Sequence, residues 1–234
     1  GKNSSALLYF LKKILGTRRD VRLSAISIDE GTKGNRDCHV AANIADAIGV
    51  ELITGSFEEV FGKTIDEVVM EKGDRFSCTF CRVLRGRCLN RIAHDHDMTK
   101  LALGINLDDE AQNVLVNVFR GDPERLLKPA DTLPEIVPII RPFLSIPARE
   151  VALYAYLHVE GFEIRQCPHS HNALITDVHS LLNDYTWRHP STKYAIVNLS
   201  EQLVSYGFMP GTHADICPIR GESDLSEYRP CRML

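Results

Sequence analysis

Several features that would place this chain in a special class of protein are absent from its sequence. It has only 11 prolines among 234 residues and shows no internal repeat and no low-complexity segment, as expected for an ordinary globular chain. No run of about 18 or more apolar residues occurs, and no basic segment followed by an apolar one opens the chain. We therefore expect no membrane partner, no secretion and a cytoplasmic location.

Basic residues are not in excess either. Lys and Arg together number 27 against 31 Asp and Glu, which gives a formal net charge of -4. This balance argues against a globally basic nucleic-acid-binding protein but leaves room for a local basic face. The 7 cysteines are an odd number, and their spacing is more typical of metal ligands than of a disulfide framework. A reducing compartment is therefore expected.

The chain opens with Gly1-Lys2-Asn3-Ser4-Ser5, directly before a helix whose apolar face carries Leu7, Leu8, Leu11, Ile14 and Leu15. A glycine, a lysine and hydroxyls at this place can form a phosphate cradle, because helix N-terminal N–H groups attract anions. Alternatively, Asn3 or Ser4 caps an ordinary helix. Asn3 stands where a Walker loop has Ser or Thr, which disfavours that class. No strand precedes the loop, so we expect a truncated N-terminus.

Runs rich in β-branched residues alternate with helical patterns along the chain. The patterns predict strands at 21–29, 50–54, 99–105 and 136–143, and helices at 35–48, 57–70, 106–119, 147–161, 172–187 and 191–206. This alternation predicts an α/β fold with a parallel sheet between helices. Ligands bind beyond the carboxyl ends of such strands, where Asn3, Asp29 and Gly31 should lie. Asp29 could equally be a solvated turn residue.

Cysteines at the start of a further predicted helix form the second informative block. Cys78 and Cys81 are separated by two residues, and Cys167 is the nearest later candidate partner. Three cysteines could hold an iron–sulfur cluster with one iron left open, or a zinc completed by His169 or His171, and a lone Cys-x-x-Cys could be a redox pair. Both histidines could instead be ordinary loop residues. Two further cysteines, Cys38 and Cys88, are expected in the core.

Arginines follow the cysteine pair without an intervening acid. The helix carries Arg82, Arg85, Arg87 and Arg91, and Arg120 and Arg125 come later in the chain. In an acidic protein such a local positive stripe is a candidate site for RNA phosphates. A solvated helix face is the alternative.

An acidic block follows the predicted strand 99–105. Gly104 permits a close backbone approach, and Asp108 and Asp109 at the start of a helix could bind Mg²⁺ that bridges triphosphate oxygens. Acids in the first turn of a helix are also ordinary capping residues. Spacing alone does not separate these two roles.

Together these blocks resemble the PP-loop ATPases that thiolate tRNA, the two-thiouridine and two-thiocytidine synthetases. The start Gly1-Lys2-Asn3-Ser4 resembles the second half of the family loop S-G-G-K-D-S, and the helix from Cys78 to Arg91 resembles its Cys-x-x-Cys helix. Gly104-Ile105-Asn106-Leu107-Asp108-Asp109 is similar to its G-H-N-x-D-D block, and Cys167-Pro168 to its later cysteine. The four blocks occur in the family's order from residue 1 to about 206.

The resemblance implies an ATP-dependent enzyme that adenylates the C2 oxygen of a tRNA pyrimidine, expected to be uridine, before sulfur replaces it. Cys78, Cys81 and Cys167 would hold a [4Fe-4S] cluster, and Asp109 and Arg85 would handle the reacting oxygen. ATP would be bound by these residues: Gly1, Lys2, Asn3, Ser4, Ser5, Ile28, Asp29, Gly104 and Asp108. RNA contacts are expected from Arg82, Arg87, Arg91, Arg120 and Arg125. Other expected partners are Mg²⁺, a sulfur donor (sulfide, a persulfide or a carrier protein) and a second copy of the chain.

The resemblance also implies a domain organisation. Residues 1–143 would form the PP-loop ATPase domain, 144–207 a helical extension with the third cluster cysteine, and 208–234 a degenerate zinc-ribbon tail. The tail keeps Cys217 and Cys231 but has Arg220 and Leu234 at the other two ligand positions. A structural zinc is therefore not expected there.

Two departures define the competing hypothesis. Asn3 replaces the loop aspartate of the family, and Ile105 replaces its histidine. The alternative is a tRNA-binding or scaffold subunit that keeps the cluster without adenylating its substrate. A PP-loop synthetase for a small molecule would account for the sheet but not for the Cys-x-x-Cys helix, and ranks last.

Overall fold

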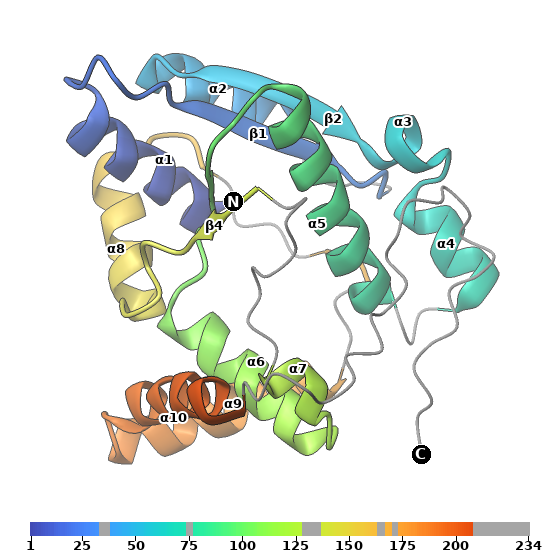
Figure 1. Ribbon diagram of the computed structural model, residues 1–234, viewed down its shortest axis with the longest axis vertical. Helices are drawn as coiled ribbons and strands as arrows, with labels where there is room; N and C mark the ends of the chain where they lie inside the picture. The colour runs from blue at the N-terminus through green and yellow to red at the C-terminus, as the bar shows by residue number, and fades with distance from the viewer. Residues whose placement is uncertain (33–37, 74–76, 128–136, 163–166, 170–172, 208–234) are drawn as a thin grey trace.

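Helices and strands alternate along the first half of the chain in the computed structural model, which describes residues 1–32, 38–73, 77–127, 137–162, 167–169 and 173–207 (Figure 1). The elements of this half are α1 (Lys2–Leu15), β1 (Ser24–Asp29), α2 (Cys38–Ile48), β2 (Glu51–Ser56), α3 (Phe57–Phe61), α4 (Ile65–Lys72) and α5 (Ser77–Asp95). The second half contains β3 (Leu101–Ala102), α6 (Leu107–Phe119), α7 (Pro123–Leu127), β4 (Ile139–Ile140), α8 (Ala148–His158), α9 (Ala173–Arg188) and α10 (Thr192–Gly207). The predicted α/β class is confirmed.

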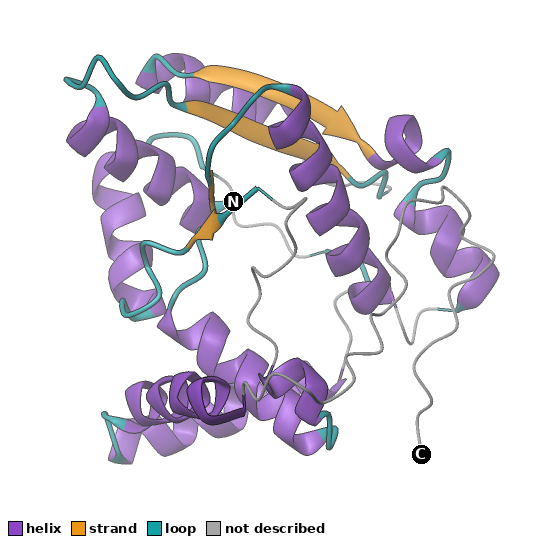
Figure 2. Ribbon diagram, in the orientation of Figure 1, coloured by secondary structure: helices purple, strands orange, loops and turns teal. Residues whose placement is uncertain are grey.

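The described strands pair in parallel, as the alternation predicts. Strands β1 and β2 pair along six residues each, from Ser24 opposite Glu51 to Asp29 opposite Ser56, and both pack against α2 and α5 (Figure 2). Strands β3 and β4 form a second parallel pair of two residues each. The predicted strands 99–105 and 136–143 were therefore too long. The pairing of β3 with β4 ends at Ala102, and two residues later Gly104 packs against the backbone of Asn3 and Ser4 in α1.

A second correction concerns the predicted helix 57–70, which the structure divides into α3 and α4. Gly62 adopts a left-handed conformation with φ of 68° and ends α3. Thr64 then caps α4 in a reciprocal capping box with Glu67. The break was visible in the sequence as a glycine before a Thr-x-x-Glu pattern, but the continuous apolar spacing concealed it.

The described part of the predicted loop 121–135 also contains an unpredicted short helix, α7. Pro123 occupies its first position, where a missing N–H costs nothing, and the Asp122 carboxylate accepts a hydrogen bond from the Arg125 backbone N–H at 3.0 Å. The structure thereby brings Arg125 beside the end of α6.

Three groups of buried apolar side chains hold these elements together. The first joins α1 to α8 through Ala6, Leu7, Leu11, Phe143, Val151 and Ala155. The second joins β1, α3, α4 and α5 through Ile28, Phe57, Ile65, Val68, Leu84 and Cys88. The third joins α6 to α9 and α10 through Leu107, Ala111, Val116, Val178, Leu182 and Val197, and Figure 1 shows these three helices at the end of the molecule away from β1 and β2.

Cys88 is completely buried, so its prediction as a core residue is confirmed. The predicted apolar face of α1 is confirmed at Leu7 and Leu11, whereas Ile14 is 50% exposed. Burial of Cys38, and the whole zinc-ribbon-like tail 208–234, lie outside the described residues. Within the described ranges, no helix is both long and apolar enough to cross a membrane.

Candidate active site

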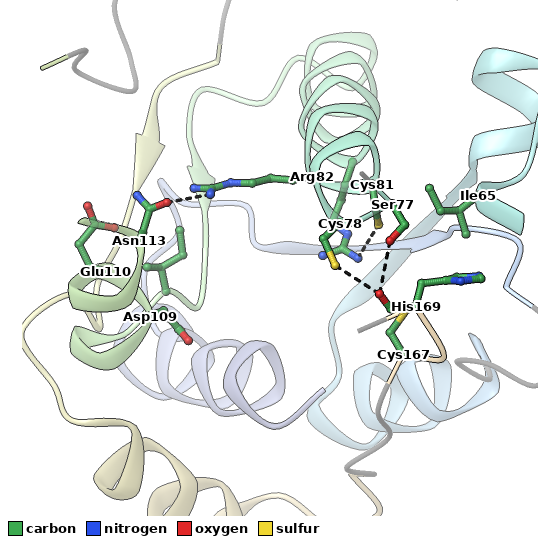
Figure 3. A pocket seen from close by; sticks show the side chains of 12 residues that line it. Ile65, Ser77, Cys78, Cys81, Arg82, Asp109, Glu110, Asn113, Cys167 and His169 are labelled. Carbon is green, nitrogen blue, oxygen red and sulfur yellow. Dashed lines mark hydrogen bonds between the residues drawn. The ribbon is translucent and has the colours of Figure 1, made fainter. Parts of the chain in front are cut away.

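A cavity of about 390 Å³ opens between α4, α5, α6 and the stretch 167–169 (Figure 3). Its walls include all three predicted cluster cysteines and both predicted catalytic residues. The lining residues are Ile65, Ser77, Cys78, Cys81, Arg82, Arg85, Ile105, Asp109, Glu110, Asn113, Cys167 and His169. Residues that are up to 104 positions apart in the sequence therefore meet at one place, as their assignment to a single site requires.

The three cysteines reach the cavity from two segments. Cys78 and Cys81 belong to the first turns of α5, and Cys167 comes from the later stretch; each is half-buried and present as a thiol. The Cys78 thiol lies 3.5 Å from the backbone oxygen of His169 (Figure 3). An Arg85 guanidinium nitrogen donates to the Cys81 sulfur at 3.3 Å. Two polar contacts therefore join the thiols to the cavity wall.

This donor set fits an iron–sulfur cluster better than a single metal ion. Among the described residues, no group of three His, Cys, Asp or Glu side chains could hold one ion. The ring of His169 instead bonds Asp66 through Nε2 at 2.7 Å, so the zinc alternative completed by His169 is not supported, and His171 lies outside the described residues. In a cubane cluster each thiolate binds a different iron, so three thiols around a cavity match its needs without converging on one point.

The beginning of α1 meets the acidic block at close range. A Cβ atom on Gly104 would lie 2.9 Å from the Asn3 carbonyl carbon, so glycine is required for the backbone approach predicted there. Asn3 Nδ2 lies 3.4 Å from Asp109 Oδ2, while Asn3 Oδ1 is buried and has no hydrogen-bond partner. A buried acceptor without a donor indicates a place for a ligand or an ordered water.

The first turn of α1 lacks a side-chain cap, which leaves its N–H groups available for an anion. Gly1 is the N-cap residue, so the alternative that Asn3 or Ser4 caps the helix is wrong. The Ser5 hydroxyl bonds back to the Gly1 carbonyl at 3.2 Å. Burial raises the pKa of the nearby Asp109 carboxyl, and the positive charge of Lys2 is close enough to offset part of that rise.

The two aspartates of the acidic block have different surroundings. Asp109 lines the cavity and forms a capping box with Asn106, so the alternative capping role is confirmed for this residue, while its catalytic role stays a prediction. Its surroundings raise the pKa of the Asp109 carboxyl: loss of solvation is the largest cause, opposed by the Asn106 N–H. Asp108 instead bonds Lys193 Nζ at 2.5 Å and the Ala148 N–H at 2.8 Å, joining α6 to α10 and α8 outside the cavity wall.

The sequence did not reveal the partner of Arg85. Its guanidinium pairs at 2.5 Å with the Glu30 carboxylate, which is only 3% exposed and lies directly after β1. Burial has the largest single effect and lowers the pKa of Arg85. The charge and hydrogen bond of Glu30, together with the negative charges of Cys81 and Cys167, outweigh burial and leave the pKa raised. Arg85 is therefore a fixed cation at the cavity wall, and its buried Nε has no hydrogen-bond partner.

The predicted arginine stripe is divided in the structure. Arg82 donates to Asn113 Oδ1 at 2.8 Å, Arg91 pairs with Asp95 at 3.8 Å, and Arg87 has a buried Nε without a partner. Loss of solvation lowers the pKa of Arg82, Glu110 raises it, and nearby Arg125 and Arg120 lower it further. We call Arg82, Arg120 and Arg125 the arginine group, because α5, α6 and the α7 region bring their charges together.

The remaining predicted ATP-binding residues at β1 lie outside the cavity wall. Ile28 is buried in the core group with Phe57. The Asp29 carboxylate accepts a hydrogen bond from the Gly31 N–H at 2.8 Å, as expected for its alternative role as a turn residue.

Sequence reasoning missed Glu30, Asp66, Ser77 and Asn113. Asn113 follows Asp109 by one helical turn, a spacing that could have indicated it. Nothing comparable in the sequence connects Glu30 or Asp66 with the site.

Comparison with known proteins gives the family. The sequence model of the PP-loop domain family matches residues 1–166 of this chain. The chain is 34% identical over 218 residues to tRNA 2-thiolation protein NcsA of Haloferax volcanii, covering 87% of this chain and 67% of that protein. It is 31% identical over 245 residues to cytoplasmic tRNA 2-thiolation protein 1 of Anopheles gambiae, covering 99% of this chain and 70% of that protein.

A solved structure agrees with the sequence matches. The U34-tRNA thiolase NcsA from Methanococcus maripaludis, determined with its [4Fe-4S] cluster, superposes with a TM-score of 0.80 at 31% identity, covering 88% of this chain and 69% of the other. The resemblance drawn from the sequence blocks is thereby confirmed. With a matching domain model and relatives matched over most of its length, the chain belongs to the PP-loop family of tRNA 2-thiolation proteins.

Proposed function

We propose that this chain carries out ATP-dependent 2-thiolation of a tRNA uridine in the cytoplasm, using a [4Fe-4S] cluster held by Cys78, Cys81 and Cys167. The observation that carries the proposal is the meeting of these thiols with Asp109 and Arg85 around one cavity. The names of the relatives support tRNA as substrate, and the cluster of the archaeal structure supports the metal assignment.

In the proposed first step, the C2 oxygen of the base attacks the α-phosphorus of ATP and pyrophosphate leaves. The uncapped start of α1 and the charge of Lys2 would bind the pyrophosphate. The unpartnered Asn3 Oδ1 and the Asp109 carboxylate are oxygen ligands of the kind that Mg²⁺ prefers, and they lie at the same place. ATP contacts from Gly1, Ser4, Ser5 and the β1 residues Ile28 and Asp29 remain part of the proposal.

In the proposed second step, a sulfur atom attacks C2 and AMP leaves with the former C2 oxygen. A cluster held by Cys78, Cys81 and Cys167 would supply iron to which the incoming sulfur could bind. Arg85, held by Glu30, places a permanent positive charge where negative charge develops on the reacting oxygen. The raised pKa of Asp109 favours its protonated form, which suits a group that holds or passes a proton. The sulfur would come from sulfide, from a carrier protein, or from a persulfide that an external thiol reduces to sulfide with formation of a disulfide.

The arginine group is the proposed tRNA contact beside the cavity. The positive charges of Arg120 and Arg125 lie close enough to Arg82 to help lower its pKa, beside the larger effect of burial, so the three cations repel one another; Arg120 and Arg125 are exposed. Polyanion binding offsets such mutual repulsion.

Adenylation can be tested by ATP–pyrophosphate exchange with the anaerobically prepared chain, with and without bulk tRNA. Exchange that requires tRNA supports the proposal, and an Asp109→Asn variant should lose it. Formation of two-thiouridine, measured by mass spectrometry of digested tRNA, then tests sulfur transfer separately.

A second candidate, a tRNA-binding subunit without adenylation, is favoured by Ile105. Its aliphatic side chain lines the cavity and has no hydrogen-bonding group, whereas the family block G-H-N-x-D-D that this stretch resembles has histidine at that place. Binding of tRNA and a stable cluster without any exchange would favour this candidate over the enzyme.

A further inference from the structure

The third cysteine lies outside the helices and strands. Cys167 and His169 belong to a described stretch, 167–169, that forms a turn. Cys78 and Cys81, in contrast, are fixed by the backbone of α5. Side-chain and backbone contacts of the turn must therefore set the place of Cys167 at the cavity.

His169 supplies three such contacts. Its ring Nε2 bonds Asp66 Oδ1 on α4 at 2.7 Å. Its backbone oxygen lies 3.4 Å from the Ser77 hydroxyl and 3.5 Å from the Cys78 thiol (Figure 3). One residue thus connects the turn to α4 through its ring and to the start of α5 through its backbone. We call the pair of Asp66 and His169 the latch.

The latch is built on a fixed base. Asp66 follows Ile65, whose N–H donates to the Glu30 carbonyl at 2.8 Å, and Thr64 caps the same helix. Gly31 packs so closely on Thr64 that a Cβ there would lie 2.5 Å from a Thr64 methyl. The carboxyl end of β1 therefore determines where Asp66 stands.

Burial makes the latch contact strong. The side chains of His169 and Asp66 are 19% and 13% exposed, so water competes little for their hydrogen bond. An acid in the first turn of a helix is already favoured by the N–H groups there. The Asp66 carboxylate is hydrogen-bonded to His169, a residue 103 positions away in the sequence.

We propose that Asp66 and His169 are positioning residues that seat Cys167 beside Cys78 and Cys81 before any cluster is present. The proposal rests on the proposed function in one respect, namely that the three thiols bind a cluster. The latch itself is a property of the metal-free chain. Its consequence is that the third ligand is pre-organised, which lowers the entropic cost of binding.

The test measures proximity in the metal-free protein. The reduced, anaerobic full chain is treated with a short bifunctional thiol reagent, and the bridged peptides that join Cys167 to Cys78 or Cys81 are quantified by mass spectrometry. Asp66→Ala and His169→Ala should each lower the yield roughly tenfold, the size expected for one buried hydrogen bond to a charged group. The double variant should fall no further, because both changes break the same contact.

Two variants separate positioning from mere stability. Glu67→Ala removes the capping box of α4 without touching the latch, so it should destabilise the helix but leave bridging within about twofold of the parent. Asp66→Asn keeps an oxygen that can accept the bond and should retain most of the bridging. Unchanged bridging in Asp66→Ala, or an equal loss in Glu67→Ala, would overturn the proposal.

Iron and sulfide uptake then shows whether the proposed function also holds. In the parent chain, bridging together with uptake supports both proposals. Bridging without uptake of iron and sulfide supports the latch proposal and contradicts the cluster assignment. The latch variants should take up cluster with a lower affinity, measured by competition with a chelator.

Discussion

The Glu30 carboxylate, almost completely buried after β1, is paired with the guanidinium of Arg85 on α5. Arg85 also donates to the Cys81 sulfur, so one cation joins the end of the strand to a proposed cluster ligand. The pair places a fixed charge at the cavity without leaving either group alone in a site of low polarity.

Removing the charge of Glu30 should therefore affect both folding and activity. We expect Glu30→Gln to lower the free energy of unfolding by about 1–3 kcal/mol, less than for a fully buried pair because Arg85 is 37% exposed. Two-thiouridine formation should also fall, since Arg85 loses its anchor. Urea denaturation of the metal-free chain gives the first quantity. Glu71→Gln, which breaks the exposed pair with Lys63, is the matched control and should cost about 1 kcal/mol or less.

Asp109 and Asp108 should respond differently to the same substitution. Asp109→Asn keeps an acceptor for the capping box but removes the acid, so kcat should fall by roughly 100-fold or more while cluster content and tRNA affinity persist. Asp108→Asn breaks the bond to Lys193 and should mainly lower stability. Single-turnover thiolation assays compare the two. Equal losses of kcat would contradict the assignment of Asp109 as the acid of the site.

The raised pKa of Asp109 predicts a direction for the pH dependence of stability. A carboxyl with a folded pKa above its unfolded value binds its proton more tightly when folded, so its contribution is present below about pH 3.8 and is lost as pH rises through the folded pKa. The stability of the parent relative to Asp109→Asn should therefore decrease over that range. Denaturant midpoints of both chains at several pH values check this, and an increasing difference would contradict it.

Cys167→Ala should abolish the visible absorbance of the anaerobically purified chain and most of its bound iron. The control is Cys88→Ala, which also removes a thiol but from the core, away from the cavity. That variant should lose stability and retain the cluster. A full cluster in Cys167→Ala would show that another residue completes the ligand set.

The arginine group should make tRNA binding sensitive to salt. If each of Arg82, Arg120 and Arg125 contacts a phosphate, replacing all three by Gln should reduce the slope of log affinity against log salt by about 2–3. Arg18→Gln, which removes an exposed arginine paired with Asp20 outside the arginine group, should leave the slope unchanged. Equal effects of the two changes would indicate a general charge effect instead of a local contact.

Local sequence signals predicted much of this architecture. Some features depend only on residues that are close in the sequence, and these were predicted: the alternation of strands and helices and the cysteine pair at the start of α5. The close approach at Gly104 was also predicted, because a glycine is the residue that permits it. The pairing of Glu30 with Arg85 depends on how β1 packs against α5, and no local pattern encodes it. Periodicity also cannot tell Asp108 from Asp109, because adjacent helical positions point in directions about 100° apart and only the packing decides which meets the cavity.

The contact between Gly104 and Asn3 has a mechanical consequence. The chain after β3 rests directly on the backbone of α1, with no side chain between them to yield. The first turn of α1 and the start of α6 must therefore shift together as one rigid piece. A displacement imposed on the first turn of α1 by an arriving phosphate would pass to Asp109 through this backbone contact and through the approach of Asn3 Nδ2 to Asp109 Oδ2.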